Sequence, residues 1–225
     1  MNKLYERLSN YTLEDALNLE LKDRQFIALE KLWKKLLDKE LFLALTISNS
    51  IICYQLSWKW ENYWEEFSDY FTAIEVDRFN FLDKLSFFIS QSKNNKRFVS
   101  TKQWRIEKIR PFIDSFFWKG EYYYKNMTQL RDELSKTMKQ KKDAKTIVFA
   151  VKMFWYSSRT LFDFIEYPED VSIPIDSRLS NLFEIYKWEY EDINLFYSDL
   201  SNNLKISPLH LDWIVWNLYE KLIVK

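Results

Sequence analysis

The chain has 225 residues, 47% of them hydrophobic and 29% charged, a composition typical of a globular protein rather than a disordered or coiled-coil one. Its formal net charge is zero, so no overall positive field indicates nucleic-acid binding. A nucleic-acid-binding site would have to depend on local clusters of cations. The single cysteine and single histidine exclude an intrachain disulfide, a Cys/His zinc site and a four-cysteine iron–sulfur cluster. With one glycine and four prolines, few residues favour tight turns, which predicts an almost wholly helical fold.

Apolar residues three and four apart predict a series of helices in the first half of the chain. The first is expected to begin at Thr12, a good N-cap residue that is followed by acidic side chains. The predicted ranges are 12–23, 24–38, 40–57 and 60–71, followed by a helical pattern over 76–118. Within that last pattern the candidate helix starts are Asp77, Thr101 and Pro111.

The longest uncharged stretch runs from Leu41 to Trp58. Polar residues such as Thr46 and Asn49 interrupt it, so a buried core helix fits it better than a membrane span. The first ten residues contain no apolar signal core, which gives no indication of secretion. Together with the single cysteine, this predicts a reducing, intracellular setting.

The second half contains a predicted helix–turn–helix. Gly120 and the tyrosines after it mark a junction, a short amphipathic helix is expected over Thr128 to Met138, and a longer one over Ala144 to Phe162. The turn between them, Lys139 to Asp143, is basic. Five lysines fall within ten residues here: Lys136, Lys139, Lys141, Lys142 and Lys145. Most charge runs of this kind are solvated turns, and a nucleic-acid contact is the alternative.

Two further helices are expected near the end of the chain. Asp176 has the residue type of an N-cap for a helix over 177–186, after a loop bracketed by prolines. A C-terminal helix is expected from about Pro208, with Asp212 and Trp216 on one face because they are four residues apart.

The residue types leave few kinds of chemistry open. His210 is the only histidine and the chain has no Gly-containing nucleophile elbow, which argues against a hydrolytic triad, and a packed or capping role is the better interpretation of His210. Phosphate-binding loops of the P-loop or dinucleotide type need glycines that are absent. Lysine and carboxylate chemistry remains: Lys145 opens a helix beside other ammonium groups, which favours the neutral, nucleophilic amine, although surface lysines are common at such positions.

Several blocks together closely resemble the archaeal 8-oxoguanine DNA glycosylase (AGOG) family of the helix-hairpin-helix superfamily. The blocks are LKDRQFIAL near Gln25, CYQLSWKWENYWEEF around Trp64, AKTIVFAVKM from Ala144, IPIDSRL from Ile173 and SPLHLDWIVW from Ser207. The resemblance implies an all-α helix-hairpin-helix glycosylase fold, with two helical subdomains flanking a base-binding cleft. It also implies one glycosylase domain over 1–225, with the hairpin and catalytic aspartate in 126–186.

The resemblance further implies a bifunctional glycosylase and lyase of base excision repair. Lys145 matches the family's nucleophile, which captures the damaged nucleotide as an imine, and Asp176 matches its catalytic aspartate. Positions that match the base pocket, which receives a flipped base, are Gln25, Cys53, Trp64, Phe149, Lys152, Pro174, Asp212 and Trp216. Each of these aromatic residues would serve equally well in a core, and Cys53 could be an inert buried thiol.

One departure concerns the hairpin, which in this superfamily usually contains glycines that let backbone N–H groups approach a phosphate, whereas here the turn is Lys-Gln-Lys-Lys-Asp. We expect damaged DNA as the partner, no cofactor or metal, a monomer, no membrane association, and a cytoplasmic, nucleoid-associated location. Two alternatives stay open: a non-catalytic helical DNA-binding module, and a glycosylase for another damaged base.

Overall fold

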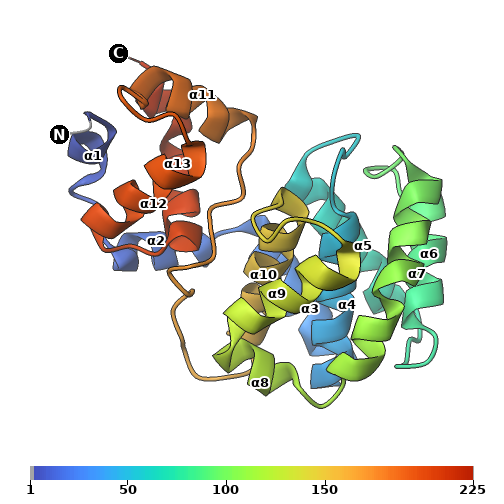
Figure 1. Cartoon of the computed structure of the whole chain (residues 1–225). Helices are drawn as coiled ribbons and strands as arrows, with labels where there is room; N and C mark the ends of the chain where they lie inside the picture. Colours follow the sequence, from blue (N-terminus) through green and yellow to red (C-terminus); the bar gives the residue numbers. More distant parts are fainter. Residues whose placement is uncertain (1–2, 225) are drawn as a thin grey trace. The chain divides into compact units, whose positions relative to one another are not determined.

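The computed structural model describes residues 3–224, and over that range every regular element is an α-helix, as the glycine-poor sequence predicts (Figure 1). The chain divides into two compact units. The central unit is Asp23–Ile165, and the terminal unit combines residues 3–22 with residues 166–224. None of the helices within 3–224 is both long enough and apolar enough to cross a membrane.

The central unit is built around two buried helices. Its helices are α3 (Arg24–Leu36), α4 (Lys39–Ile52), α5 (Trp60–Ala73), α6 (Phe81–Gln91), α7 (Val99–Phe116), α8 (Gly120–Lys125), α9 (Met127–Met138) and α10 (Lys145–Ser158). Every residue of α4 from Leu41 onward is buried, which confirms the predicted core helix. The most extensive helix contact of this unit joins α4 to α10, and α3, α8 and α9 also pack on α10.

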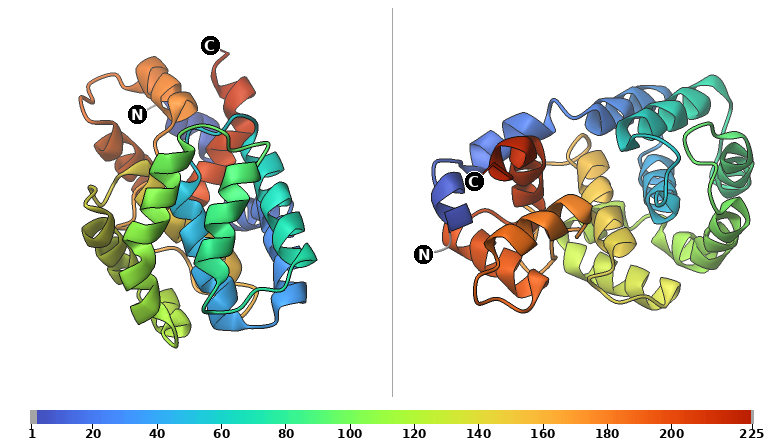
Figure 2. Two further views of the ribbon diagram at one scale, coloured as in Figure 1. Left: turned by 90° about the vertical axis from the view of Figure 1, so that its right-hand side faces the viewer. Right: turned by 90° about the horizontal axis from the view of Figure 1, so that it is seen from above.

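The terminal unit joins the two ends of the chain. Its helices are α1 (Lys3–Leu8), α2 (Leu13–Glu20), α11 (Ser177–Tyr186), α12 (Ile193–Leu204) and α13 (Pro208–Leu222). In Figure 2 the blue N-terminal helices lie beside the red C-terminal helix, in agreement with the packing of α2 on α13. His210 is fully buried here, with Nδ1 2.7 Å from Oε1 of the equally buried Glu20, so the packed interpretation of this histidine is confirmed.

Several predicted boundaries differ from the structure. Pro111 does not start a helix but lies inside α7, on its exposed side, because the apolar residues around it, Ile109 and Phe112 among them, keep that helix packed. The helix predicted to reach Phe162 ends at Ser158, and the one predicted to reach residue 57 ends at Ile52. Helices α1, α8 and α12 were not predicted, and Gly120 begins α8 where a junction was expected. The Asp176 N-cap is confirmed.

The turn between α9 and α10 closes without glycine. Lys139 adopts the left-handed conformation, with φ 51° and ψ 50°. Its N–H donates to the carbonyl of Lys136 and the next N–H, of Gln140, donates to the carbonyl of Ser135, which is the Schellman arrangement. The Ser135 hydroxyl also donates to the Gln140 carbonyl at 2.6 Å. A lysine therefore occupies the position at which glycine is favoured, and the hydrogen bonds hold the turn.

We predict that Lys139→Gly raises the free energy of unfolding by about 0.5–1 kcal/mol, because glycine adopts the left-handed conformation without steric cost. Urea unfolding of the parent and the variant measures the change. Lys141→Gly is the matched control, since Lys141 is exposed in the same turn and has no positive φ. A Lys139→Gly variant no more stable than Lys141→Gly would contradict the prediction.

Candidate active site

Lys145 is the first residue of α10, where this buried helix reaches the edge of the core. The side chains from Ile147 to Ser158 are all buried, whereas Lys145 is half-buried. Its N-cap, Ala144, supplies no capping side chain. The amine lies over the ring of Trp60, with Nζ 5.0 Å from the ring centroid. The core of the central unit thus fixes the backbone of Lys145 and leaves its amine in a pocket.

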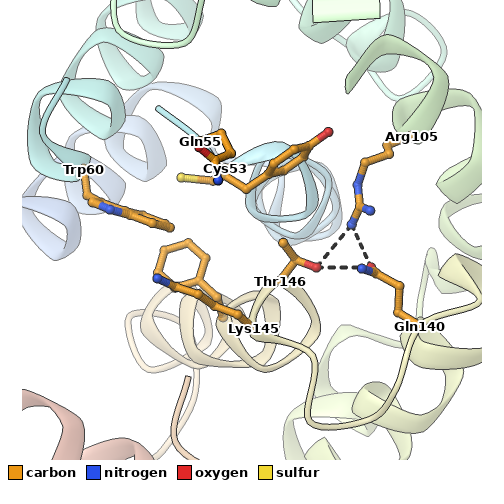
Figure 3. Close-up of a pocket in the computed structure, with 9 residues that line it drawn as sticks. Cys53, Gln55, Trp60, Arg105, Gln140, Lys145 and Thr146 are labelled. Carbon is orange, nitrogen blue, oxygen red and sulfur yellow. Dashed lines mark hydrogen bonds between the residues drawn. The ribbon is translucent and has the colours of Figure 1, made fainter. Parts of the chain in front are cut away.

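That pocket has a volume of about 330 Å³ and lies wholly within the central unit (Figure 3). Its lining residues come from the ends of α4 and α9, the starts of α5 and α10, and α7: Cys53, Tyr54, Gln55, Trp60, Arg105, Gln140, Lys145, Thr146 and Phe149. The rings of Trp60 and Phe149 meet edge to face with centroids 4.8 Å apart. None of these nine residues has a carboxylate, so the pocket presents cations, neutral polar groups and aromatic rings.

Arg105 ties the glycine-free turn to the rest of the pocket. Its guanidinium donates to Gln140 Oε1 at 2.9 Å and to Thr146 Oγ1 at 3.3 Å, on either side of the turn. It also donates to the carbonyl of Ile51 at 3.0 Å, in the last turn of α4. Gln140 and Thr146 complete a triangle, visible as dashed lines in Figure 3. One side chain therefore orders the turn that precedes Lys145.

A buried cation, Lys102, lies next to the pocket residue Tyr54. Lys102 is fully buried, donates to the amide oxygen of Asn95, and lies over the ring of Tyr54 with Nζ 4.8 Å from its centroid. Burial lowers the pKa of the Lys102 amine to about 8. Burial also raises the pKa of the Cys53 thiol well above its usual range, more than nearby Lys102 lowers it. The Cys53 thiol therefore stays protonated near neutral pH and is a poor nucleophile.

The other predicted residues of the central unit are also buried. Trp64 is fully buried in α5, with its ring centroid 6.4 Å from that of Phe149. Gln25 is buried in the first turn of α3, and Lys152 is buried in α10 two turns after Lys145. Burial raises the pKa of Asp23, the N-cap of α3, to about 7, although the Gln25 backbone N–H and the Lys152 charge oppose the shift. Neither Gln25 nor Lys152 lines the pocket of Lys145.

The remaining predicted residues belong to the terminal unit. Asp176 caps α11, and its Oδ1 accepts the backbone N–H groups of Arg178 and Leu179, each at 2.9 Å. The Arg178 guanidinium lies 3.8 Å from the centroid of the Trp216 ring. Asp212 is buried one turn before Trp216 in α13, and Pro174 is buried in the loop before Asp176.

The carboxylates of Asp176 and Asp212 act on a common neighbour. The pKa of the Tyr197 hydroxyl is raised well above its usual range, first by burial and then by the charges of Asp176 and Asp212. Both carboxylates therefore lie close enough to Tyr197 to influence it, although 36 residues of sequence separate them. The terminal unit thus gathers Asp176 and Asp212 in one region.

Sequence reasoning missed six of the nine residues that line the pocket of Lys145, Trp60, Arg105 and Tyr54 among them. The sequence could have identified Trp60, because it lies four residues before Trp64 and hence on the same face of the predicted 60–71 helix. Arg105 and Tyr54 gave no such indication, since nothing in the sequence pairs α7 with the turn before Lys145.

Comparison with known proteins identifies the family of this chain. A family model described as AGOG, N-glycosylase/DNA lyase, matches residues 5–224, nearly the whole chain. The chain belongs to this family. The resemblance noted from the sequence blocks is thereby confirmed, and it extends through both units.

Individual members of the family are similar over most of their length. The N-glycosylase/DNA lyase of Methanococcus maripaludis is 39% identical over 221 residues, covering 96% of this chain and 86% of that protein. The one from Thermococcus kodakarensis is 39% identical over 219 residues, covering 96% and 82%. A crystal structure of Pa-AGOG, the 8-oxoguanine DNA glycosylase from Pyrobaculum aerophilum complexed with 8-oxoguanosine, matches with a TM-score of 0.80 and 25% identity, covering 96% and 86%. The all-α family fold is therefore shown.

We predict that the buried amine of Lys102 makes stability depend on pH. Its folded pKa of about 8 lies below the ordinary value of 10.5, so between these limits the unfolded chain binds more protons. Stability should therefore rise with pH across this window, by on the order of 3 kcal/mol in total, relative to Lys102→Met. Urea unfolding of both proteins at pH 7, 8, 9 and 10 measures the difference, in which other titrating groups largely cancel. A difference that is constant from pH 7 to 10 would refute this.

Proposed function

We propose that this protein removes 8-oxoguanine from DNA and then cuts the strand at the resulting abasic site, with Lys145 as the nucleophile. The observation on which this depends is the Lys145 amine, exposed to a carboxylate-free pocket at the start of a buried helix, in a chain of the N-glycosylase/DNA lyase family. The base is proposed from the similar Pyrobaculum aerophilum protein, whose structure holds 8-oxoguanosine.

The proposed reaction can be followed bond by bond. The neutral Lys145 amine attacks the sugar carbon that bears the base, the glycosidic bond breaks, and the base leaves with the electron pair and takes up a proton. The nitrogen loses a proton, the sugar ring opens to give an imine, and the ring oxygen becomes a hydroxyl. Loss of the adjacent sugar proton then expels the 3′ phosphate and cuts the strand. Water releases the lysine, so the cycle requires no metal or organic cofactor.

Asp176 is the proposed partner of Lys145 in this chemistry. Its Oδ1 accepts two backbone N–H groups at the start of α11, and these bonds fix the orientation of the carboxylate. Oδ2 is engaged by no hydrogen bond within the described part of the terminal unit. We propose that Asp176 stabilises the positive charge that develops on the sugar as the base departs.

The remaining predicted positions are proposed to bind the flipped base. Phe149 and Trp216 are proposed to offer ring faces that replace the lost base stacking, and the fully buried Trp64 packs near Phe149, with ring centroids 6.4 Å apart. Gln25 is buried, and its amide oxygen has no hydrogen-bond partner in the described residues, which suits an N–H on the edge of an oxidised guanine. The other proposed pocket residues are Cys53, Lys152, Pro174 and Asp212.

The turn between α9 and α10 is the proposed phosphate contact. Lys139 and Lys141 are exposed in it and form no ion pair in the described residues, whereas Lys142 pairs with Asp132 at 2.6 Å.

We further propose that residues 1–225 act as one functional domain, with the hairpin and catalytic aspartate in 126–186. We also propose that the protein works as a monomer associated with the nucleoid in the cytoplasm.

We predict that borohydride traps the parent protein covalently on a duplex containing one 8-oxoguanine and does not trap it on the undamaged duplex. Lys145→Gln should lower the yield at least about 100-fold, because glutamine cannot form an imine. Asp176→Asn should slow release of the base while leaving trapping on a pre-formed abasic site less affected. Gel analysis of trapped and cut strands measures both steps.

Lys34→Gln is the matched control, since Lys34 is an exposed lysine on α3, outside the proposed site. It should trap like the parent. If the parent traps a pre-formed abasic site but not the 8-oxoguanine duplex, Lys145 is competent and another damaged base is the substrate. Trapping on neither DNA would favour a non-catalytic DNA-binding module.

We also predict that DNA binding weakens as salt rises and that Lys139→Gln and Lys141→Gln each reduce the slope of log affinity against log salt by about 1. The reason is that each lysine in contact with a phosphate releases about one counterion. Fluorescence anisotropy with a labelled duplex at several salt concentrations measures the slope. An unchanged slope in both variants would place the phosphate contacts on another surface.

A further inference from the structure

Trp60 connects the two sides of the pocket. It is the first residue of α5, and its ring lies 5.0 Å from Lys145 Nζ and 4.8 Å from the Phe149 ring. Figure 3 shows the end of the Lys145 side chain directed toward the face of this ring. Trp60 is half-buried, so its packing on Phe149 restrains the ring while one face stays available to the amine.

The other groups around the Lys145 amine offer it no negative charge. From the end of α4, Cys53 and Tyr54 face the pocket, and burial raises the pKa of both, which keeps them neutral near pH 7. From α7 comes the Arg105 cation, and the turn and α10 contribute the neutral Gln140 and Thr146. In the described part of the central unit, Lys145 forms no ion pair. The electron-rich face of Trp60 is therefore the favourable contact for an ammonium group in this pocket.

We propose that Trp60 is a positioning residue, which holds the Lys145 amine in place through a cation–π contact until substrate enters. This inference rests on the proposed function of Lys145. A cation–π contact forms only with the charged amine, so replacing Trp60 should change how the reaction of Lys145 depends on pH. Trp60 acts through Lys145 and need not contact the reacting sugar. A residue that only filled space would affect stability without changing this pH dependence.

The test uses single-turnover borohydride trapping on a duplex with a pre-formed abasic site, which removes base recognition from the measurement. Rates are measured from pH 5.5 to 9 for the parent, Trp60→Leu and Trp60→Phe. In Trp60→Leu we expect the pH of half-maximal rate to fall by roughly 0.5–1 unit, because the ammonium loses its contact. The plateau rate should fall about tenfold, because the amine is less well positioned. Trp60→Phe should show a smaller effect on both quantities, since phenylalanine binds cations less strongly.

Trp58→Leu is the matched control. Trp58 lies two residues earlier, is 69% exposed and does not line the pocket, so its pH profile should match the parent. The inference is overturned if Trp60→Leu keeps the parent profile, or if only its plateau falls while the pH of half-maximal rate is unchanged. If Trp60→Leu does not fold in a thermal unfolding control, the pH shift of Trp60→Phe decides by the same criterion. A parent that fails to trap at all would instead reject the proposed function, and this inference with it.

Discussion

Helix α10 is buried along its whole length after the first turn, because α3, α4, α8 and α9 pack around it. A helix enclosed in this way cannot shift or rotate without breaking the core contacts of α4 as well, since the α4–α10 contact is the most extensive in the central unit. Its first residue, Lys145, is therefore held at a fixed point on the edge of the core. The pocket, the basic turn and the contact with Trp60 all depend on that anchoring.

The turn before Lys145 shows how a chain with one glycine can build a tight hairpin. Lys139 takes the left-handed conformation, and the Schellman hydrogen bonds together with the Ser135 hydroxyl offset the strain. Arg105 then joins both sides of the turn to the end of α4. Side-chain hydrogen bonds replace the conformational freedom of glycine, and Lys139 and Lys141 stay exposed in the turn.

The family assignment and the geometry support different parts of the functional argument. Membership of the N-glycosylase/DNA lyase family follows from a match over residues 5–224 and from relatives at 39% identity. The geometry gives a reason for particular residues: an amine in a carboxylate-free pocket, and a carboxylate oriented by two backbone N–H groups in the terminal unit. Asp176 and Asp212 share Tyr197 as a neighbour, so the terminal unit brings these two carboxylates into one region.

The sequence by itself determined the helical class, because scarce glycine and proline leave few alternatives, and it located the core helix α4 and the cap at Asp176 through local patterns. Local patterns also indicated that Lys145 begins a helix, while its role as nucleophile came from family resemblance. The tertiary structure alone decided that α7 runs through Pro111, and that Arg105 and Trp60 line the pocket of Lys145. The physical reason is that these outcomes depend on contacts between helices distant in sequence, and side-chain periodicity specifies which face a helix buries but not which helix covers it.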